Sequence, residues 1–396
     1  MEKKIRVLQI NSVYNYGSTG RIVKKIHEYL LSKGHESFVI FGRAHAIGDK
    51  REVTVEDNVF YIHNDFESNS EVLFGTVFDS HGLHCKKNTE KIIAKIEEIN
   101  PDLIQLHVIH GFYINYEMLF EYLKKTNRKV VWTLHDCWPY TGFCSHYMYT
   151  NCEEYKTGCK TCKFRNVYPY RIFSNAKKHY ELKKRLFTGL NMSLVTPSKW
   201  LKGELKDSFL SEYECTVINN AIETKDFSYK PDIDLLKEYH LENKRMALAV
   251  SPSFYPQKGY ADYLELSKLL DDSWQIVLIG VSDKQIKELP SNITGIKRVN
   301  NVDILAKWYS NAEVFINLSH EDNYPSVNIE AMSCGTPVIG YKTGGIPEQI
   351  EGYGHIFNKG EVNEIAKMMN EKSFERIDYK YDNHMCEDYL ELYKSL

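Results

Sequence analysis

Short apolar strands alternate with amphipathic helices along almost the whole of this 396-residue chain. A strand, a crossover helix and a second strand form a parallel pair, and repetition of that unit gives a sheet covered by helices on both faces. The expected strands are 5–10, 36–41, 103–108, 130–134, 194–196, 216–219, 247–250, 275–279, 314–318 and 337–340. The pattern therefore predicts an α/β fold with two doubly wound, Rossmann-like domains that face a cleft.

The alternation is interrupted twice, and these interruptions divide the chain. A polar stretch at 223–234 reads as a linker between a first domain at 1–222 and a second at 223–379. A Cys- and Tyr-rich segment at about 137–175 reads as an insertion in the first domain. A final helical pattern at 380–396 is expected to pack back on the first domain. In such sheets, ligands bind beyond the carboxyl ends of the strands.

Charge and hydropathy exclude several classes of protein. The chain has 50 Lys and Arg against 53 Asp and Glu, a formal charge of −3, which argues against a nucleic-acid partner. No window approaches the ~20 apolar residues of a membrane span. The opening MEKKIRVLQI lacks the long apolar run and cleavage site of a signal peptide. We therefore expect a cytoplasmic protein, whose clustered cysteines are thiols or metal ligands rather than disulfides.

The segment 320–339, HEDNYPSVNIEAMSCGTPVI, carries the densest chemical signal. A strand delivers Asp322 into a turn, and a helix is expected to start near Ser326, with Glu330 about one turn inside it. The first amides of that helix, at Ser326 and Val327, suit a phosphate. The carboxylates beside them would accept hydroxyls, such as those of a ribose or a sugar. A capped helix with a buried, hydrogen-bonded Glu330 is the alternative interpretation.

This segment resembles the E-x7-E region of retaining GT-B glycosyltransferases of the family-four type. Other segments resemble motifs of that family in the same order along the chain, so the resemblance covers nearly all of it. They are 15–20 (NYGSTG), 133–136 (TLHD), 196–198 (TPS), 217–223 (VINNAIE), 258–259 (KG) and 344–348 (GGIPE). The stretch WTLHDCW at 132–138 is similar to the polysaccharide-assembly members.

The resemblance implies a role for each matching residue. Lys258 would neutralise the leaving diphosphate, Glu330 would bind the ribose, Asp322 would hold the donor sugar, and His135 would lie at the sugar. The donor-binding residues would be Gly17, Gly20, Glu321, Asn323, Ser326 and Val327. Two departures are that Asp322 stands where the family usually has Glu, and that the Arg before the lysine is missing.

The implied function is a retaining glycosyltransferase that moves a sugar from a nucleotide diphosphate-sugar, most often a UDP-sugar in this family, to a glycan or lipid-linked acceptor. The setting would be bacterial surface polysaccharide synthesis. No D-x-D metal motif is evident, so no cofactor is expected for catalysis. The alternatives are a nucleotide-sugar epimerase of the same fold and a non-catalytic sugar-nucleotide binder. An NAD-dependent enzyme is disfavoured because the glycine loop is not G-x-G-x-x-G.

Four cysteines, Cys144, Cys152, Cys159 and Cys162, crowd into the insertion. Four thiolates around a C-x2-C fit a structural, tetrahedral zinc site, which would order a long loop without joining the chemistry. Free thiols and a redox pair at Cys159 and Cys162 are the alternatives. 

The remaining signals are basic and imidazole side chains. The expected helix at 176–187 carries Lys177, Lys178, Lys183, Lys184 and Arg185 together with His179. Such a basic face could make peripheral contact with the inner face of an anionic membrane, although a solvated face is the simpler interpretation. His107 and His110 lie at or near the end of the expected strand 103–108, and we read them as core or surface residues.

Overall fold

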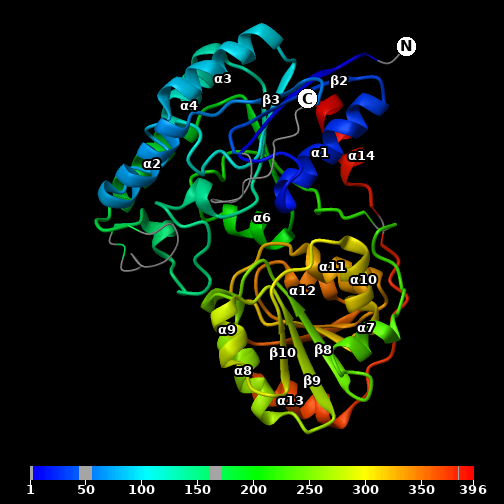
Figure 1. The fold of residues 1–396 in the computed structure, drawn as a ribbon. Helices are drawn as coiled ribbons and strands as arrows, with labels where there is room; N and C mark the ends of the chain where they lie inside the picture. Colours follow the sequence, from blue (N-terminus) through cyan, green and yellow to red (C-terminus); the bar gives the residue numbers. More distant parts are fainter. Residues whose placement is uncertain (1–2, 44–55, 161, 163–170, 224, 382) are drawn as a thin grey trace. The chain divides into compact units, whose positions relative to one another are not determined.

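The computed structural model describes residues 3–43, 56–160, 162, 171–223, 225–381 and 383–396 (Figure 1). The chain forms two compact units, one of residues 1–220 with 384–396 and one of residues 221–383. These boundaries differ from the expected ones by two residues at the first crossing and four at the second.

The first unit is built on a parallel seven-stranded sheet with the order β3-β2-β1-β4-β5-β6-β7. Its strands are β1 (Arg6–Asn11), β2 (Glu36–Phe41), β3 (Val59–Tyr61), β4 (Leu103–Leu106), β5 (Val130–Thr133), β6 (Met192–Thr196) and β7 (Cys215–Val217). Its helices are α1 (Gly17–Ser32), α2 (Asp65–Phe78), α3 (Lys86–Ile99), α4 (Tyr116–Thr126), α5 (Ala176–Phe187), α6 (Lys199–Leu205) and α14 (Met385–Ser395), with short 3-10 turns at Trp138–Tyr140 and Glu154–Thr157. The strand order reverses at β1, which pairs with both β2 and β4.

The second unit contains a parallel six-stranded sheet with the order β10-β9-β8-β11-β12-β13. Its strands are β8 (Arg245–Val250), β9 (Trp274–Ile279), β10 (Ile293–Ile296), β11 (Val314–Asn317), β12 (Val338–Tyr341) and β13 (Gly354–Phe357). Its helices are α7 (Ile233–Glu238), α8 (Tyr260–Leu269), α9 (Asp283–Glu288), α10 (Val302–Asn311), α11 (Ser326–Ser333), α12 (Ile346–Ile350) and α13 (Val362–Glu371), with a 3-10 turn η3 at Pro256–Lys258. The expected α/β class with two doubly wound sheets is confirmed.

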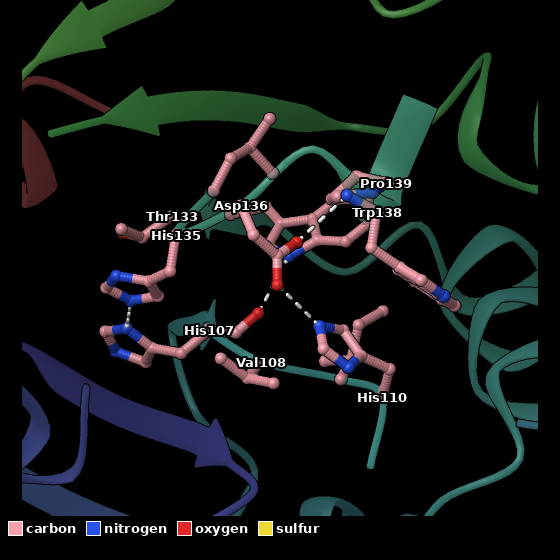
Figure 2. Close-up of a pocket in the computed structure, with 11 residues that line it drawn as sticks. His107, Val108, His110, Thr133, His135, Asp136, Trp138 and Pro139 are labelled. Atoms are coloured by element: carbon pink, nitrogen blue, oxygen red, sulfur yellow. Dashed lines mark hydrogen bonds and ion pairs between the residues drawn. The ribbon is translucent and has the colours of Figure 1, made fainter. Parts of the chain in front are cut away.

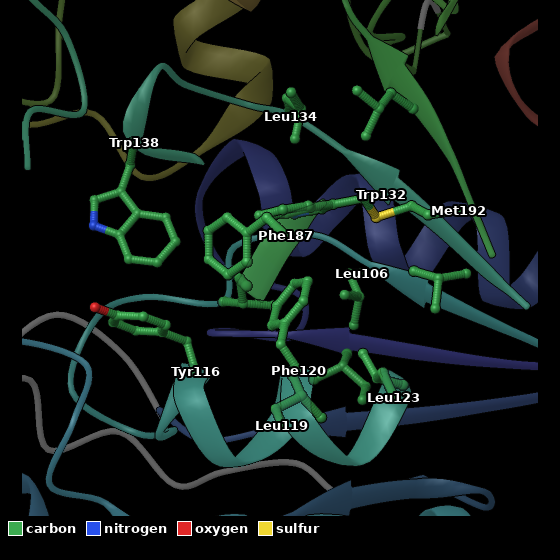
Figure 3. Packing of buried hydrophobic residues seen from close by; sticks show 14 of the residues in the cluster. Leu106, Tyr116, Leu119, Phe120, Leu123, Trp132, Leu134, Trp138, Phe187 and Met192 are labelled. Carbon is green, nitrogen blue, oxygen red and sulfur yellow. The ribbon is translucent and has the colours of Figure 1, made fainter. Parts of the chain in front are cut away.

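Aromatic packing anchors the middle of the first sheet (Figure 3). The ring of Phe187, at the end of α5, lies 4.3 Å from the ring of Phe120 on α4 and 5.0 Å from that of Trp132 on β5, measured between centroids. Pairs of this kind each contribute ~0.5–1.5 kcal/mol beyond the area that they bury. Because Trp132 lies one residue before the end of β5, this core fixes the strand end that leads to His135.

The C-terminal helix α14 belongs to the first unit and supports the same strand end. The hydroxyl of Tyr389 lies 2.8 Å from the hydroxyl of Thr133, the last residue of β5. Thr133 also accepts a hydrogen bond from the Gln105 side chain at 2.6 Å. The expected helix at 380–396 starts only at Met385, because the residues before it still belong to the second unit, where the rings of Tyr379 and Tyr353 pack 4.7 Å apart.

Helix α2 was not expected from the sequence. Several of its apolar side chains, including Phe66, Leu73 and Phe74, are exposed, so its hydrophobic pattern does not follow one buried face. Within the described residues, no helix has the length and apolar character needed to cross a membrane.

Candidate active site

Lys258 and Asp322 come together at the carboxyl ends of two neighbouring strands of the second unit. Lys258 ends η3 after β8, and Asp322 lies in the loop after β11, which pairs with β8. The Lys258 ammonium lies 2.6 Å from an Asp322 carboxylate oxygen and donates to the Glu321 carbonyl at 3.1 Å. The backbone of His320 adds a 2.8 Å hydrogen bond to the Gln257 carbonyl. The two loops are therefore fastened to each other, and the cation sits against them.

Gly259 explains why glycine follows this lysine. Its φ is +72°, in the left-handed region, and a Cβ there would overlap the carbonyl oxygen of Leu318. Only glycine combines that φ with such a close approach of two backbones at no steric cost. The Lys-Gly pair thus allows η3 to pack against the end of β11 and to bring Lys258 to the loop.

Helix α11 begins where the sequence predicts, with Pro325 as its N-cap and Ser326 as its first residue. A buried relay holds this end: Asn317 donates to Asn328 at 2.9 Å, Asn328 to Gln349 at 2.8 Å, and Gln349 to the Pro325 carbonyl at 2.9 Å. The relay leaves the first-turn amides at the end of the helix, where its dipole favours an anion.

The predicted donor-binding residues of this unit surround the start of α11. Glu321 and Asn323 are buried, while Ser326 and Val327 are half-buried in the first turn. The Asn323 carbonyl accepts from the Gly345 amide at 2.8 Å, so the turn that opens α12 supports the same loop.

Glu330 is buried one turn inside α11. Its carboxylate accepts a hydrogen bond of 2.9 Å from the hydroxyl of Tyr309, on α10. Burial and the neighbouring carboxylate raise the pKa of Tyr309 well above its ordinary value, so the phenol remains a donor. The sequence did not identify Tyr309 as this partner, because the two residues lie 21 positions apart and belong to different helices.

His135 lies just after β5 in the first unit, and His107 lies just after the neighbouring β4 (Figure 2). The Nε2 atom of His135 is 3.0 Å from Nδ1 of His107, and the planes of the two rings are 17° apart, with centroids separated by 5.3 Å. Burial lowers the pKa of His135 to about 4 and that of His107 well below its ordinary value. Both imidazoles are therefore neutral at pH 7. His107 is buried, which agrees with its interpretation as a core residue, and its ring contacts that of the predicted site residue His135.

A histidine and a carboxylate form a second pair close to these two histidines. His110 Nε2 lies 2.9 Å from an Asp136 carboxylate oxygen, and the other oxygen accepts from the Trp138 amide at 2.9 Å (Figure 2). Burial alone would raise the pKa of Asp136, but His110 and the other neighbours outweigh it, so the pKa is lowered and the carboxylate stays charged. A small pocket at this strand edge is lined by His107, Val108, Ile109, His110, Trp132, Thr133, Leu134, His135, Asp136, Trp138 and Pro139.

Gly17 and Gly20 lie in the turn between β1 and α1. Gly17 has a φ of +63° and opens the helix, and Gly20 is buried in its first turn, where its carbonyl accepts from the Asn15 amide at 3.1 Å. Since β1 is the neighbour of β4, this turn and His107 lie at the same carboxyl edge of the first sheet.

The predicted zinc site is not supported. Among the described residues, no group of three or more His, Cys, Asp or Glu side chains is arranged to hold a metal ion. No disulfide joins Cys144, Cys152, Cys159 or Cys162. Arg171 Nη2 lies 2.7 Å from the Cys162 sulfur, and the Gly142 amide donates to the Cys159 sulfur at 3.1 Å. The thiols of Cys144 and Cys162 are hydrogen-bonded to each other. Residues 161 and 163–170 of the expected insertion lie outside the described residues.

The expected basic face of α5 needs correction. Lys183 and His179 are buried, so neither can face a membrane. The Lys183 ammonium lies 3.5 Å from the Trp138 ring centroid and donates to the Trp138 carbonyl at 2.7 Å, and burial lowers its pKa to about 7. Lys177, Lys178 and Arg185 remain exposed. The helical spacing misled here because a lysine can be buried when its charge finds carbonyl and aromatic partners.

The predicted residues thus fall into two groups. The first unit holds Gly17, Gly20 and His135, and the second unit brings Lys258, Glu321, Asp322, Asn323, Ser326, Val327 and Glu330 to one edge of its sheet.

A comparison with known protein families gives a match within the second unit. Residues 233–376 match the family model of glycosyl transferases group 1. A protein of Escherichia coli (strain K12) named as a colanic acid biosynthesis glycosyl transferase, WcaC, is 24% identical over 348 residues, which span 85% of this chain and 82% of that protein.

Solved structures share the fold across both units. Sucrose-phosphate synthase from Thermosynechococcus elongatus has a TM-score of 0.64 at 16% identity, covering 93% of this chain and 89% of that one. HepE of Anabaena in complex with UDP-glucose has a TM-score of 0.61 at 14% identity, with the same coverage. The chain therefore has the GT-B fold, and its residues 233–376 are similar to glycosyl transferases group 1.

Proposed function

We propose that this protein is a retaining glycosyltransferase that transfers a sugar from a nucleotide diphosphate-sugar, most simply a UDP-sugar, to a glycan or lipid-linked acceptor during bacterial surface polysaccharide synthesis. The observation that carries the proposal is the position of Lys258, fastened beside the Glu321–Asp322 loop in a domain that matches group 1 glycosyl transferases. The likeness to WcaC favours the polysaccharide setting.

Each part of a nucleotide sugar has a chemically matched partner in the second unit. The Lys258 ammonium would meet the diphosphate, with the first-turn amides of Ser326 and Val327 as further donors. The Glu330 carboxylate would accept hydroxyls of the ribose, and Asp322 would accept hydroxyls of the sugar. Structures of HepE contain UDP and UDP-glucose, which supports a uracil nucleotide as the donor.

In the proposed reaction, the bond between the anomeric carbon and the diphosphate oxygen breaks, and its electron pair leaves with the diphosphate. The acceptor oxygen bonds to the same carbon from the same face, and the acceptor proton passes to the departing phosphate oxygen. Lys258 would stabilise the charge that develops on the diphosphate. A cation in this position makes a catalytic metal unnecessary, so activity is expected to persist in EDTA.

The decisive experiment is a donor screen followed by product analysis. UDP-, GDP- and ADP-sugars are tested by thermal shift, since a cognate donor raises the melting temperature by mass action. The donor that binds is then incubated with a lipid-linked acceptor, and NMR reports the anomeric configuration of the new bond. Retained configuration supports the proposal, and inversion contradicts it. Release of epimerised nucleotide sugar without acceptor would identify an epimerase instead.

Peripheral membrane contact is part of this proposal because a lipid-linked acceptor lies at a membrane. The support for this contact no longer comes from the basic face of α5 that the sequence suggested. Ile172 and Phe173 are exposed apolar residues just before α5, and the Ile172 amide donates to the Thr76 carbonyl of α2 at 2.9 Å. Sedimentation with anionic liposomes at low salt tests the contact, and protein that stays in the supernatant would contradict it.

A further inference from the structure

Three side chains form a hydrogen-bonded row across three neighbouring strands of the first sheet. Gln9 lies on β1, His107 follows β4, and His135 follows β5. The Gln9 carbonyl oxygen Oε1 is 3.2 Å from His107 Nε2, and His107 Nδ1 is 3.0 Å from His135 Nε2. Figure 2 shows a nitrogen of each imidazole ring joined by a dashed line at this contact.

The direction of these hydrogen bonds is determined at the Gln9 end. The amide nitrogen of Gln9 donates to the Val23 carbonyl at 3.1 Å. If the amide were reversed, two oxygens would face each other there without a proton between them. The Gln9 oxygen must therefore face His107, and because an amide oxygen only accepts, the proton of His107 is on Nε2.

The proton position in His107 in turn determines which nitrogen of His135 carries its proton. His107 is buried and neutral, so it carries a single ring proton and its Nδ1 atom can only accept. The donor at the 3.0 Å contact is consequently the Nε2–H group of His135. Since His135 is also neutral, its Nδ1 atom holds a lone pair and acts as an acceptor.

The carboxylate next to His135 in the sequence has hydrogen-bond partners of its own. Asp136 follows His135 directly, but one of its oxygens contacts His110 at 2.9 Å and the other accepts from the Trp138 amide at 2.9 Å. The buried amide of Gln9 determines the tautomer of His135 through His107.

We propose that Gln9 and His107 are positioning residues that hold His135 as the Nε2–H tautomer, so that its Nδ1 atom accepts a hydrogen bond from a sugar hydroxyl. This inference rests on the proposed function for the presence of a sugar at His135. It defines the chemistry of the recognised group: a hydroxyl can donate to Nδ1, whereas a carboxylate or a phosphate has no proton to give. It also excludes a role of His135 as a proton donor at neutral pH.

The test uses the full-length protein with 15N-labelled histidine. Long-range proton–nitrogen NMR correlations distinguish the two tautomers of a neutral imidazole, and the His135→Gln variant assigns the His135 signals. We expect a proton on Nε2 and none on Nδ1. Addition of saturating UDP-glucose should leave this state unchanged. A proton on Nδ1, in the free protein or with UDP-glucose, would overturn the inference.

A matched pair of variants at His107 separates positioning from simple packing. His107→Gln keeps an acceptor for His135 and a donor for Gln9, and it should retain the Nε2–H tautomer. His107→Leu removes the acceptor, so His135 should populate both tautomers, and kcat for sugar transfer should fall about tenfold or more while KM changes little. A single Nε2–H tautomer in a folded His107→Leu protein would contradict the proposal.

These NMR measurements need no sugar transfer, so they are independent of the proposed function. If the tautomers behave as expected but no nucleotide sugar serves as a donor, the geometry of the row stands and the proposed function fails. If transfer occurs but the tautomer is wrong, the positioning role fails alone.

Discussion

The ion pair of Lys258 with Asp322 leads to a prediction in which nucleotide affinity and stability respond very differently. We expect Lys258→Met to weaken UDP binding by about 10- to 150-fold. A hydrogen bond to a charged group contributes ~1.5–3 kcal/mol, and each ~1.4 kcal/mol corresponds to a factor of ten in Kd. The arginine that usually precedes this lysine in the resembling family is missing from the sequence, where Gln257 stands before Lys258.

The same substitution should change stability little. The side chains of Lys258 and Asp322 are 33% and 19% exposed, and partly exposed ion pairs contribute only ~0–1 kcal/mol to folding. For a unit of this size, such a change moves the melting temperature by at most about 4 °C. A large loss of affinity with a small thermal shift would therefore indicate a ligand-binding role and not a structural one.

Asp322→Asn provides a comparison of opposite sign. It removes the anion that holds Lys258 at 2.6 Å in the ligand-free protein, so UDP should bind as tightly as to wild type or more tightly. Transfer from the full nucleotide sugar should nevertheless fall, because the proposed sugar contact is lost. The matched control is Lys268→Met, which removes an exposed lysine paired with Glu265 on α8.

Isothermal titration calorimetry with UDP, together with thermal denaturation, measures all three variants. The reasoning is refuted if Lys258→Met binds UDP with the affinity of wild type, or if Lys268→Met weakens binding equally.

Three further predictions concern side chains that support the site. Tyr309→Phe removes the 2.9 Å hydrogen bond to buried Glu330, so the free energy of unfolding measured by urea titration should fall by ~1–3 kcal/mol. An unchanged free energy would show that Glu330 finds another donor. Gly259→Ala introduces a Cβ that meets the Leu318 carbonyl at a positive φ. It should destabilise the second unit by more than ~1–2 kcal/mol and abolish UDP binding. The control is Gly203→Ala, because an added Cβ there has no neighbour within 4 Å. The pKa of Asp136 is lowered in the folded state, so its ionisation stabilises the protein above the ordinary pKa of the carboxyl. Asp136→Asn should therefore be less stable than wild type at pH 7, and the difference in stability should shrink as the pH falls through the folded pKa. A difference that does not depend on pH would contradict the assignment.

Local sequence patterns correctly predicted those features in which one stretch of chain forms both a helix or strand and the site residues that it carries. The start of α11 near Ser326 follows from the local sequence, and the one-turn offset of Glu330 follows from helix geometry. The parallel class of both sheets follows from the alternation of strands and helices. These features depend on interactions between residues close in sequence, which a pattern can represent.

Contacts between distant segments were beyond the reach of such patterns. Tyr309 lies 21 residues from Glu330, and Gln9 lies 98 residues from His107, so only the packing of separate strands and helices reveals these partners. The burial of Lys183 was likewise decided by carbonyls and an aromatic ring supplied by another segment.

By itself, then, the sequence determined the α/β class, the order of the motifs and the residue types at the two strand edges, because each of these is encoded in local spacing. Only the tertiary structure decided which side chains hold Lys258, Glu330 and His135, and which ring nitrogen of His135 carries the proton. The physical reason is that hydrogen-bond direction and burial are properties of the packed neighbourhood, and the same residue has different chemistry in different surroundings.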